Sequence, residues 1–212
     1  MRSRLPERLP WLEHALQGLA FWIGHRHSLF NSYPLTEGAL VAEACNLIQA
    51  NIPRDLILLP ECLYRNLVRA SVVIDQISRQ CRADLVLCSE EARPIGREGN
   101  ISDHVRFVIE VKRGSAPKGE IDSDLSRLYH YLKNSDTAPR AFLIVISEGS
   151  AHRRFIKDGK SILGMHQIPA CDGHFRIRRS VKAAASFSGK ESAHYVSLIE
   201  VFRHKSEKVR PI

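Results

Sequence analysis

Apolar residues recur along this chain with two spacings, one typical of helices and one typical of strands. A return every three or four residues makes one side of a helix apolar, whereas a short continuous apolar run indicates a strand covered on both faces. The segments with helical spacing are residues 7–24, residues 36–51 and a stretch that begins near Asp122 or Ser123. The strand-like runs are residues 82–87, 106–112 and 141–146. The order helix, strands, helix, buried strand predicts an α/β core.

The two ends of the chain are predicted to be additions to this core. Residues 24–34 are expected to form a loop after the first helix, which gives an N-terminal helical extension over residues 1–34. Residues 35–150 form the predicted core. Residues 151–212 form a basic C-terminal extension packed on it. That extension contains a predicted β-hairpin, with strands at 174–187 and 193–202, a turn at 188–191 and a frayed tail after residue 202.

Residues 56–80 allow two interpretations. Residues 56–59 and 71–74 are apolar enough for two strands, whereas residues 61–80 can also be written as a helix. Periodicity alone does not decide between them. Residues 89–103 are rich in charge, glycine and proline, and we expect a loop there.

The second predicted helix carries a carboxylate beside its apolar stripe. Thr36 is a good N-cap residue for this helix. Glu43 comes three residues after Leu40 and four before Leu47, at the edge of the stripe. A carboxylate at such a position needs a cation, a metal or a hydrogen-bond donor. Glu37, in the first turn, is more simply explained by the favourable interaction of an acid with a helix N-terminus.

The strand-like runs carry charges where a purely structural strand would have apolar residues. Glu110 and Lys112 project to the same face of one strand, about 7 Å apart by the rise per residue. If the strand that contains Asp84 lies beside it, a second carboxylate joins them. Two carboxylates and an ammonium are the minimal equipment for holding Mg²⁺ next to a phosphodiester. The alternative is a weak surface ion pair on an edge strand.

Asp84, followed by Glu110-Val111-Lys112 on a later strand, resembles the active-site signature of the PD-(D/E)xK nuclease superfamily. The resemblance covers about residues 35–147, and Ala83 stands where the family usually has a proline. The resemblance implies a restriction-endonuclease-like core: a helix, a mixed β-sheet, a further helix and a buried strand. The N-terminal helix and the C-terminal hairpin would be attached to that core.

The resemblance also implies a role for each of these residues. Mg²⁺, for which Mn²⁺ can substitute, would be held by Asp84, Glu110 and the Val111 carbonyl, with Glu43 bound directly or through water. Lys112 would orient or help activate the attacking water. The predicted catalytic residues are therefore Asp84, Glu110, Lys112 and Glu43. A homodimer is implied as well, because family members often cut two strands with two active sites.

The charge of the chain favours a polyanionic partner. It has 31 Lys and Arg against 23 Asp and Glu, a formal net charge of +8. Residues 151–182 alone hold eight basic and two acidic residues, a net charge of +6. A basic surface of this kind is suited to phosphate contacts, although a solvated basic face without a ligand is the alternative. The arginines that we expect to contact nucleic acid are Arg113, Arg153, Arg154, Arg176, Arg178 and Arg179.

Several other functions lack their motifs. The five cysteines include no C-x-x-C pair, which argues against a zinc site and favours a reducing compartment. The apolar patch at residues 16–23 is too short to cross a bilayer, so we expect a cytoplasmic protein that does not bind membranes. Asp158-Gly159-Lys160-Ser161 ends like a phosphate-binding loop, but Arg154 stands where its first glycine is needed. No dinucleotide fingerprint is present, and no organic cofactor is expected.

The sequence therefore predicts a Mg²⁺-dependent endonuclease that hydrolyses phosphodiester bonds of nucleic acid. DNA is favoured over RNA because no aromatic and basic RNA platform is visible. A role in restriction or defence is implied only by the resemblance. The alternative is a catalytically silent subunit of the same fold that binds nucleic acid or assembles with other proteins.

Overall fold

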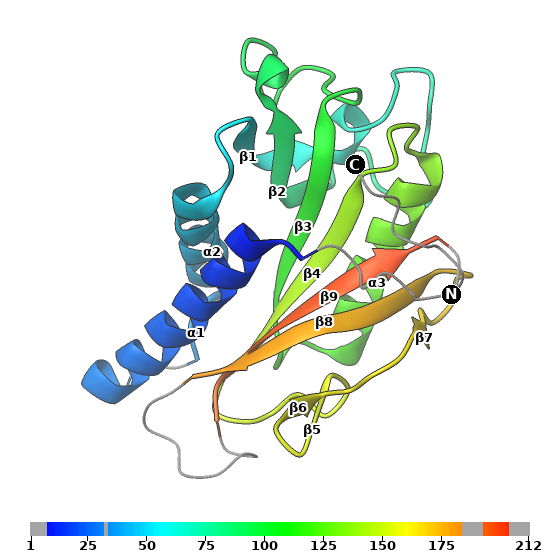
Figure 1. Cartoon of the computed structure of the whole chain (residues 1–212). Helices are drawn as coiled ribbons and strands as arrows, with labels where there is room; N and C mark the ends of the chain where they lie inside the picture. The colour runs from blue at the N-terminus through cyan, green and yellow to red at the C-terminus, as the bar shows by residue number, and fades with distance from the viewer. Residues whose placement is uncertain (1–7, 32–33, 184–192, 204–212) are drawn as a thin grey trace, which may run out of the picture.

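Helices cover both faces of a mixed β-sheet in this protein. The structure is a computed structural model that describes residues 8–31, 34–183 and 193–203. Within these ranges the chain forms a seven-stranded sheet and a separate two-stranded ribbon (Figure 1). The strand order across the large sheet is β1-β2-β3-β4-β9-β8-β7. The α/β class and the mixed sheet expected from the sequence are confirmed.

The elements have the following bounds. The helices are α1 (Pro10–Phe30), α2 (Glu37–Asn51) and α3 (Lys118–Asn134), with 3₁₀ turns η1 (Tyr64–Asn66) and η2 (Glu90–Ala92). The strands of the large sheet are β1 (Leu56–Leu63), β2 (Arg82–Ser89), β3 (Val105–Arg113), β4 (Arg140–Ser147), β7 (His166–Gln167), β8 (His174–Lys182) and β9 (Tyr195–Phe202). Strands β5 (Ile156–Lys157) and β6 (Lys160–Ser161) form the ribbon. In the described ranges, no helix is both long and apolar enough to cross a membrane.

The pairing of β3 with β4 makes the sheet mixed. These two strands run parallel, and α3 forms the crossover between them. The other neighbouring strands in the described part of the sheet pair antiparallel. In a parallel pair the second strand starts at the same end of the sheet as the first. The chain must therefore cross back from the carboxyl end of β3, and α3 begins just beyond that end.

Alternation along β3 divides its side chains between the two faces of the sheet. Ile109 and Val111 belong to the core under α1 and α2, whereas Val108 belongs to the core under α3. Glu110 and Lys112 therefore lie on the α3 face, as the two-residue period predicts. Figure 1 shows α1 and α2 on one side of the sheet and α3 on the other.

The helix at residues 37–51 begins as predicted, but the other two helices have different bounds. Thr36 caps α2, and its hydroxyl accepts a hydrogen bond from the Ala39 N–H at 3.3 Å. Helix α1 continues to Phe30, so the loop expected from residue 24 is wrong over residues 24–30. Gly24 does not end the helix but lets it approach Ala183, whose Cβ would lie 3.0 Å from a Cβ added at Gly24.

Helix α3 begins at Lys118, directly after Pro117, rather than near Asp122 or Ser123. The first turn of α3 is polar, so the spacing of apolar residues alone did not reveal where the helix begins. Asp122 and Asp124 therefore lie inside the helix and not at its start.

Residues 56–80 hold one strand and no long helix. After β1 and η1 the chain runs through turns until β2 begins at Arg82. Residues 71–74 form neither a strand nor a helix, although they are apolar. The loop expected at residues 89–103 is confirmed, apart from the end of β2 and the short η2 turn.

The predicted C-terminal hairpin continues the main sheet. Strands β8 and β9 pair antiparallel, and β9 also pairs with β4 and is buried along its whole length. The hairpin is therefore part of the central layer of the fold. Its predicted turn at 188–191 lies outside the described residues, as does the tail from residue 204.

Gly114 lets the chain leave β3 closely against the end of β4. Its N–H donates to the Ile146 carbonyl at 2.6 Å. A Cβ at Gly114 would lie 2.5 Å from Ser147 Oγ and 3.0 Å from Ser147 Cα. The backbone of β4 therefore restricts this position to glycine.

We expect Gly114→Ala to lower the free energy of unfolding by about 1 to 3 kcal/mol, because the Ser147 backbone must shift. Gly119→Ala is the matched control, since a Cβ there meets nothing within 4 Å and the residue lies in α3. The control is expected to be neutral or stabilising by up to about 1 kcal/mol. Urea denaturation of both variants measures the difference, and equal stabilities would contradict the close approach.

Candidate active site

Charged side chains from several elements meet at the carboxyl end of β3. The register of β2 with β3 ends at the pair Leu85 and Ile109, where the two strands separate. At this point Asp84 Oδ2 accepts a hydrogen bond from the Val111 N–H at 2.7 Å. The carboxylate replaces the next bond of the strand ladder and brings Asp84 beside Glu110. The expectation that Asp84 and Glu110 lie together is met by this geometry.

Glu110 is buried, with 3% of its surface exposed. Its Oε1 accepts hydrogen bonds from the Tyr64 hydroxyl at 2.6 Å and from Arg127 Nη1 at 3.1 Å. Burial raises the pKa of Glu110 to about 8, and the charge of Asp84 adds to this, against the opposing effects of Arg127 and Tyr64. Burial also raises the pKa of Asp84, although the bond from Val111 opposes it. Asp84 and Glu110 therefore lie together with too little positive charge nearby to keep both carboxyl groups ionised.

Lys112 is surrounded by acids. Its Nζ lies 2.8 Å from Glu37 Oε1, 3.5 Å from Asp124 Oδ2 and 3.9 Å from Glu120 Oε2. Burial alone would lower the pKa of Lys112, but the hydrogen bond to Glu37 and the charge of Asp124 outweigh it, and the pKa is raised. Lys112 is therefore an ammonium ion in this arrangement.

Helix α3 supplies Asp124 and Arg127 to the site. Asp124 is 3% exposed and lies between Lys112 and Arg127, whose Nη1 is 3.0 Å from Asp124 Oδ1. Arg127 in turn bridges Asp124 and Glu110. Asp124 lies inside the helix, because α3 begins six residues earlier, at Lys118. Burial raises the pKa of Asp124, against the attraction of Arg127 and Lys112.

Sequence reasoning missed Tyr64, Asp124 and Arg127 at this site. Asp124 had a usable signal, since it comes three residues after Ile121 and four before Leu128 on the apolar side of α3. Tyr64 had none, because η1 lies in the region whose structure the pattern left open.

The two glutamates of α2 lie in different surroundings. Glu37 contacts Lys112, as described above. Glu43 is half-buried, and within the described ranges its side chain makes no hydrogen bond or ion pair. The structure thus connects Glu37, and not Glu43, to the charges at the end of β3. Glu37 was explained from the sequence only by its position at the helix start.

We name this group the acidic cluster and define it by four carboxylates: Glu37, Asp84, Glu110 and Asp124. The cations that touch these carboxylates in the described structure are Lys112 and Arg127. With all groups ionised the cluster and its two cations carry a net charge of −2. The Glu37 side chain is 40% exposed, but Glu110 and Asp124 are buried, and buried charge of one sign is costly unless a counterion balances it.

The cluster fits a divalent cation in charge and in donor type. Carboxylate and carbonyl oxygens are the ligands that Mg²⁺ prefers, and a charge of +2 would balance the cluster. Among the described residues, however, no group of three or more His, Cys, Asp or Glu side chains is arranged to hold a metal ion. The oxygens that lie together are those of Asp84 and Glu110, beside the Val111 backbone.

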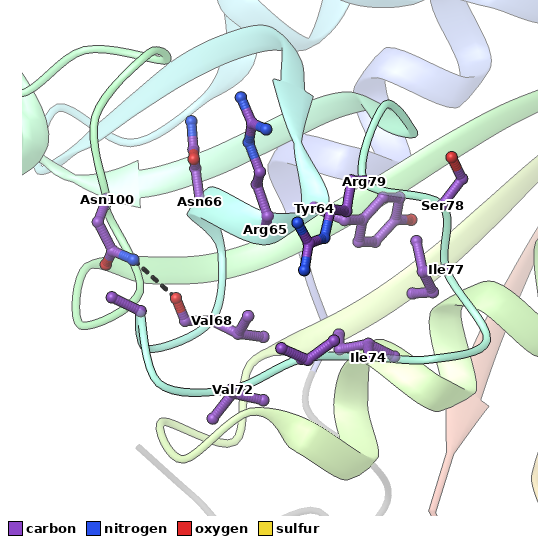
Figure 2. Close-up of a pocket in the computed structure, with 12 residues that line it drawn as sticks. Tyr64, Arg65, Asn66, Val68, Val72, Ile74, Ile77, Ser78, Arg79 and Asn100 are labelled. Carbon is purple, nitrogen blue, oxygen red and sulfur yellow. Dashed lines mark hydrogen bonds between the residues drawn. The ribbon is translucent and has the colours of Figure 1, made fainter.

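Tyr64 joins the acidic cluster to a neighbouring pocket of about 370 Å³. Its hydroxyl donates to Glu110, while its ring lines the pocket together with Val68, Ile74 and Ile77 (Figure 2). Asn100 closes one end and donates a hydrogen bond to the Val68 carbonyl at 2.7 Å, drawn as a dashed line in Figure 2. Apolar side chains form much of the lining, and Arg65 and Arg79 add two cationic groups to it (Figure 2).

The six arginines expected to contact nucleic acid do not form one patch. Arg154 pairs with Asp122 on α3 and lies over the Phe155 and Phe175 rings. Arg153 is exposed, and Arg113 is half-buried at the end of β3.

The other three, Arg176, Arg178 and Arg179, lie on the opposite face of the sheet. Arg178 pairs with Glu200 and Arg179 with Glu13 of α1. Arg176 lies over the ring of Phe202. Part of the predicted basic surface is therefore neutralised by acids of the same chain.

Comparisons with known proteins add no family to these observations. No family model matches the sequence, and neither the curated proteins nor the solved structures gave a significant match.

Without divalent cations, we expect stability to fall as pH rises from about 5 to about 8. The folded pKa of Glu110 is raised to about 8, so the stability from its protonated form is present at low pH and lost as pH rises through that value. Glu110→Gln should flatten this slope and be more stable than the wild type at pH 8, by about 1 kcal/mol or more. Urea denaturation across this range measures it, with exposed Glu90→Gln as the control. Parallel profiles for wild type and Glu110→Gln would contradict the shift.

Proposed function

We propose that this protein is a Mg²⁺-dependent nuclease of the PD-(D/E)xK type. The observation that carries the proposal is the meeting of Asp84, Glu110 and Lys112 at the carboxyl end of β3. The order α2, β1, β2, β3, α3, β4 supports it, because the resemblance implies a helix, a mixed sheet, a helix and a buried strand in this sequence. A restriction-endonuclease-like core is therefore part of the proposal.

The metal would be held by Asp84, Glu110 and the Val111 carbonyl. Mg²⁺ bound there would supply positive charge and Lewis acidity for phosphodiester hydrolysis. The sequence suggested that Glu43 helps to hold the metal, directly or through water. In our proposal the α2 glutamate that contributes to the site is Glu37 instead. Glu37 acts on Lys112 and not on the metal.

Lys112 has the state and position needed to assist the reaction. Because it is charged, it cannot remove a proton from water, but it can donate hydrogen bonds to the attacking water and to a phosphate oxygen. Glu37 and Asp124 hold its ammonium group at the site before substrate arrives. Arg127 stabilises the ionised form of Glu110 and keeps its carboxylate fixed.

DNA is the proposed substrate, and the protein is proposed to act as a homodimer in restriction or defence. The net charge of +8 supports a nucleic-acid partner. Of the arginines expected to contact nucleic acid, Arg153 is exposed and could reach phosphate, whereas Arg154 is engaged with Asp122. The homodimer and the biological role rest on the resemblance alone.

One observation favours a second function, that of a catalytically silent binding or assembly subunit. Glu110 is 3% exposed and already accepts hydrogen bonds from both Tyr64 and Arg127. A site satisfied in this way needs no metal to be stable at low pH. Metal binding separates the two functions, since a silent subunit need not bind Mg²⁺ or Mn²⁺ at Asp84 and Glu110.

We expect purified protein with Mg²⁺ or Mn²⁺ to cleave supercoiled plasmid, and Glu110→Gln and Lys112→Ala to lose about 100-fold or more of the rate. Single-stranded DNA and RNA, tested in parallel, identify the preferred substrate. Exposed Lys157→Ala and Glu90→Gln are matched controls and should keep the wild-type rate. If folded wild type is inert and a divalent cation leaves its melting temperature unchanged, the silent subunit is the better assignment.

The two α2 glutamates give a sharper test of the site. Glu37→Gln should reduce the cleavage rate about 10-fold, because Lys112 loses its shortest ion pair and its position. Glu43→Gln, the same change six residues further along the helix, should leave the rate within about twofold, since Glu43 does not contact Lys112. A larger loss in Glu43→Gln than in Glu37→Gln would restore the role that the sequence alone suggested for Glu43.

A further inference from the structure

A second group of charges, opposite in sign, lies on the other face of the sheet. It surrounds a pocket of about 580 Å³ between the start of α1 and strands β4, β9 and β8. We call this hollow the arginine pocket. Its arginines, within the described ranges, are Arg8, Arg140, Arg176, Arg178 and Arg179. Phe142 and Leu198 form its apolar floor, and Leu163, 86% exposed, lies at its rim.

One buried carboxylate organises the deepest arginines. Glu200 on β9 is 2% exposed, and its Oε1 accepts a hydrogen bond from Arg140 Nε at 2.8 Å. Its Oε2 lies 3.2 Å from Arg178 Nη1. Arg140 also lies over the Phe142 ring, at 5.1 Å from its centroid, which fixes the plane of the guanidinium. The two guanidinium groups are therefore held in place before any ligand arrives.

The pocket contains more positive charge than the chain neutralises. Its five arginines are opposed, among described residues, by Glu200 and by Glu13, which pairs with Arg179. The net charge is +3. Burial lowers the pKa of Arg178 despite the nearby Glu200, and the charges of Arg176 and Arg140 lower it further. In the described structure Arg140 Nη1 is also buried without a hydrogen-bond partner.

We propose that the arginine pocket binds a terminal phosphate or polyphosphate group with two or more negative charges. Planar guanidinium groups match phosphate oxygens with paired hydrogen bonds, and a volume of this size is typical of small-ligand sites. Such an anion would balance the excess charge and give Arg140 Nη1 an acceptor. The side chains of Arg140 and Arg178 are only 14% and 13% exposed, so the phosphates along a duplex cannot reach them, whereas a terminal group can enter.

This site is separate from the acidic cluster. Glu200 lies opposite Phe142 in the sheet register, and Phe142 belongs to the core under α1 and α2. Arg140 begins β4, whereas the acidic cluster lies beside its carboxyl end. Binding at the arginine pocket therefore does not depend on metal binding or on nuclease activity.

Phosphate binding is tested by calorimetry and thermal denaturation of the full-length protein in EDTA, which prevents metal-dependent hydrolysis. The probes are pyrophosphate, ATP, and a short single-stranded oligonucleotide with either a 5′-phosphate or a 5′-hydroxyl. We expect pyrophosphate to bind and raise the melting temperature, because an anion relieves repulsion among the arginines. Binding of ATP alone would identify a free nucleotide as the ligand. Preference for the 5′-phosphorylated oligonucleotide would identify a nucleic-acid end.

Two variants and one control locate the binding. Arg176→Gln removes a pocket charge that has no acid partner in the described residues, and Leu163→Glu places a negative charge at the exposed rim. Each should weaken pyrophosphate binding about tenfold or more. Arg54→Gln makes the same charge change on an exposed residue in the turn between α2 and β1 and should weaken it less than about twofold. Absence of binding by the wild type, or equal weakening in all three variants, would overturn the proposal.

Discussion

The parallel pairing of β3 with β4 is the constraint on which the candidate active site depends. Because the two strands run the same way, the chain must cross over from the carboxyl end of β3, and α3 is that crossover. The first turns of α3 therefore lie beside Glu110 and Lys112, and Asp124 and Arg127 enter the same group of charges. Ligand sites of α/β sheets form at such carboxyl ends for this reason.

The sheet also keeps two unbalanced groups of charge apart. The α3 face holds the acidic cluster with a deficit of positive charge, and the opposite face holds the arginine pocket with an excess. Apolar side chains of β3 and β4 fill the space between them, so neither group neutralises the other. A counterion of the opposite sign would stabilise each group, which is the physical basis for proposing a cation on one face and a phosphate on the other.

Much of the fold was predictable from the sequence, because local residue patterns indicate many of its helices and strands. The two-residue period of β3 placed Glu110 and Lys112 on one face, and Thr36 marked the start of α2. Helix α3 was predicted too late because its first turn, from Lys118, is polar and adds nothing to the apolar period. The end of α1 was missed because Gly24 resembles a helix stop, whereas here it allows a close contact with Ala183.

The sequence by itself determined which charges share a strand face, since alternation is a property of the extended backbone and needs no partner. Only the tertiary structure decided which charges from other elements join them. Glu37 instead of Glu43, and Tyr64 from the η1 turn, reach β3 through packing between elements far apart in the chain. The shared carboxylate of Glu200 likewise depends on the register of β4, β9 and β8. Such contacts are set by the register and crossing of whole elements, which no local pattern of residues records.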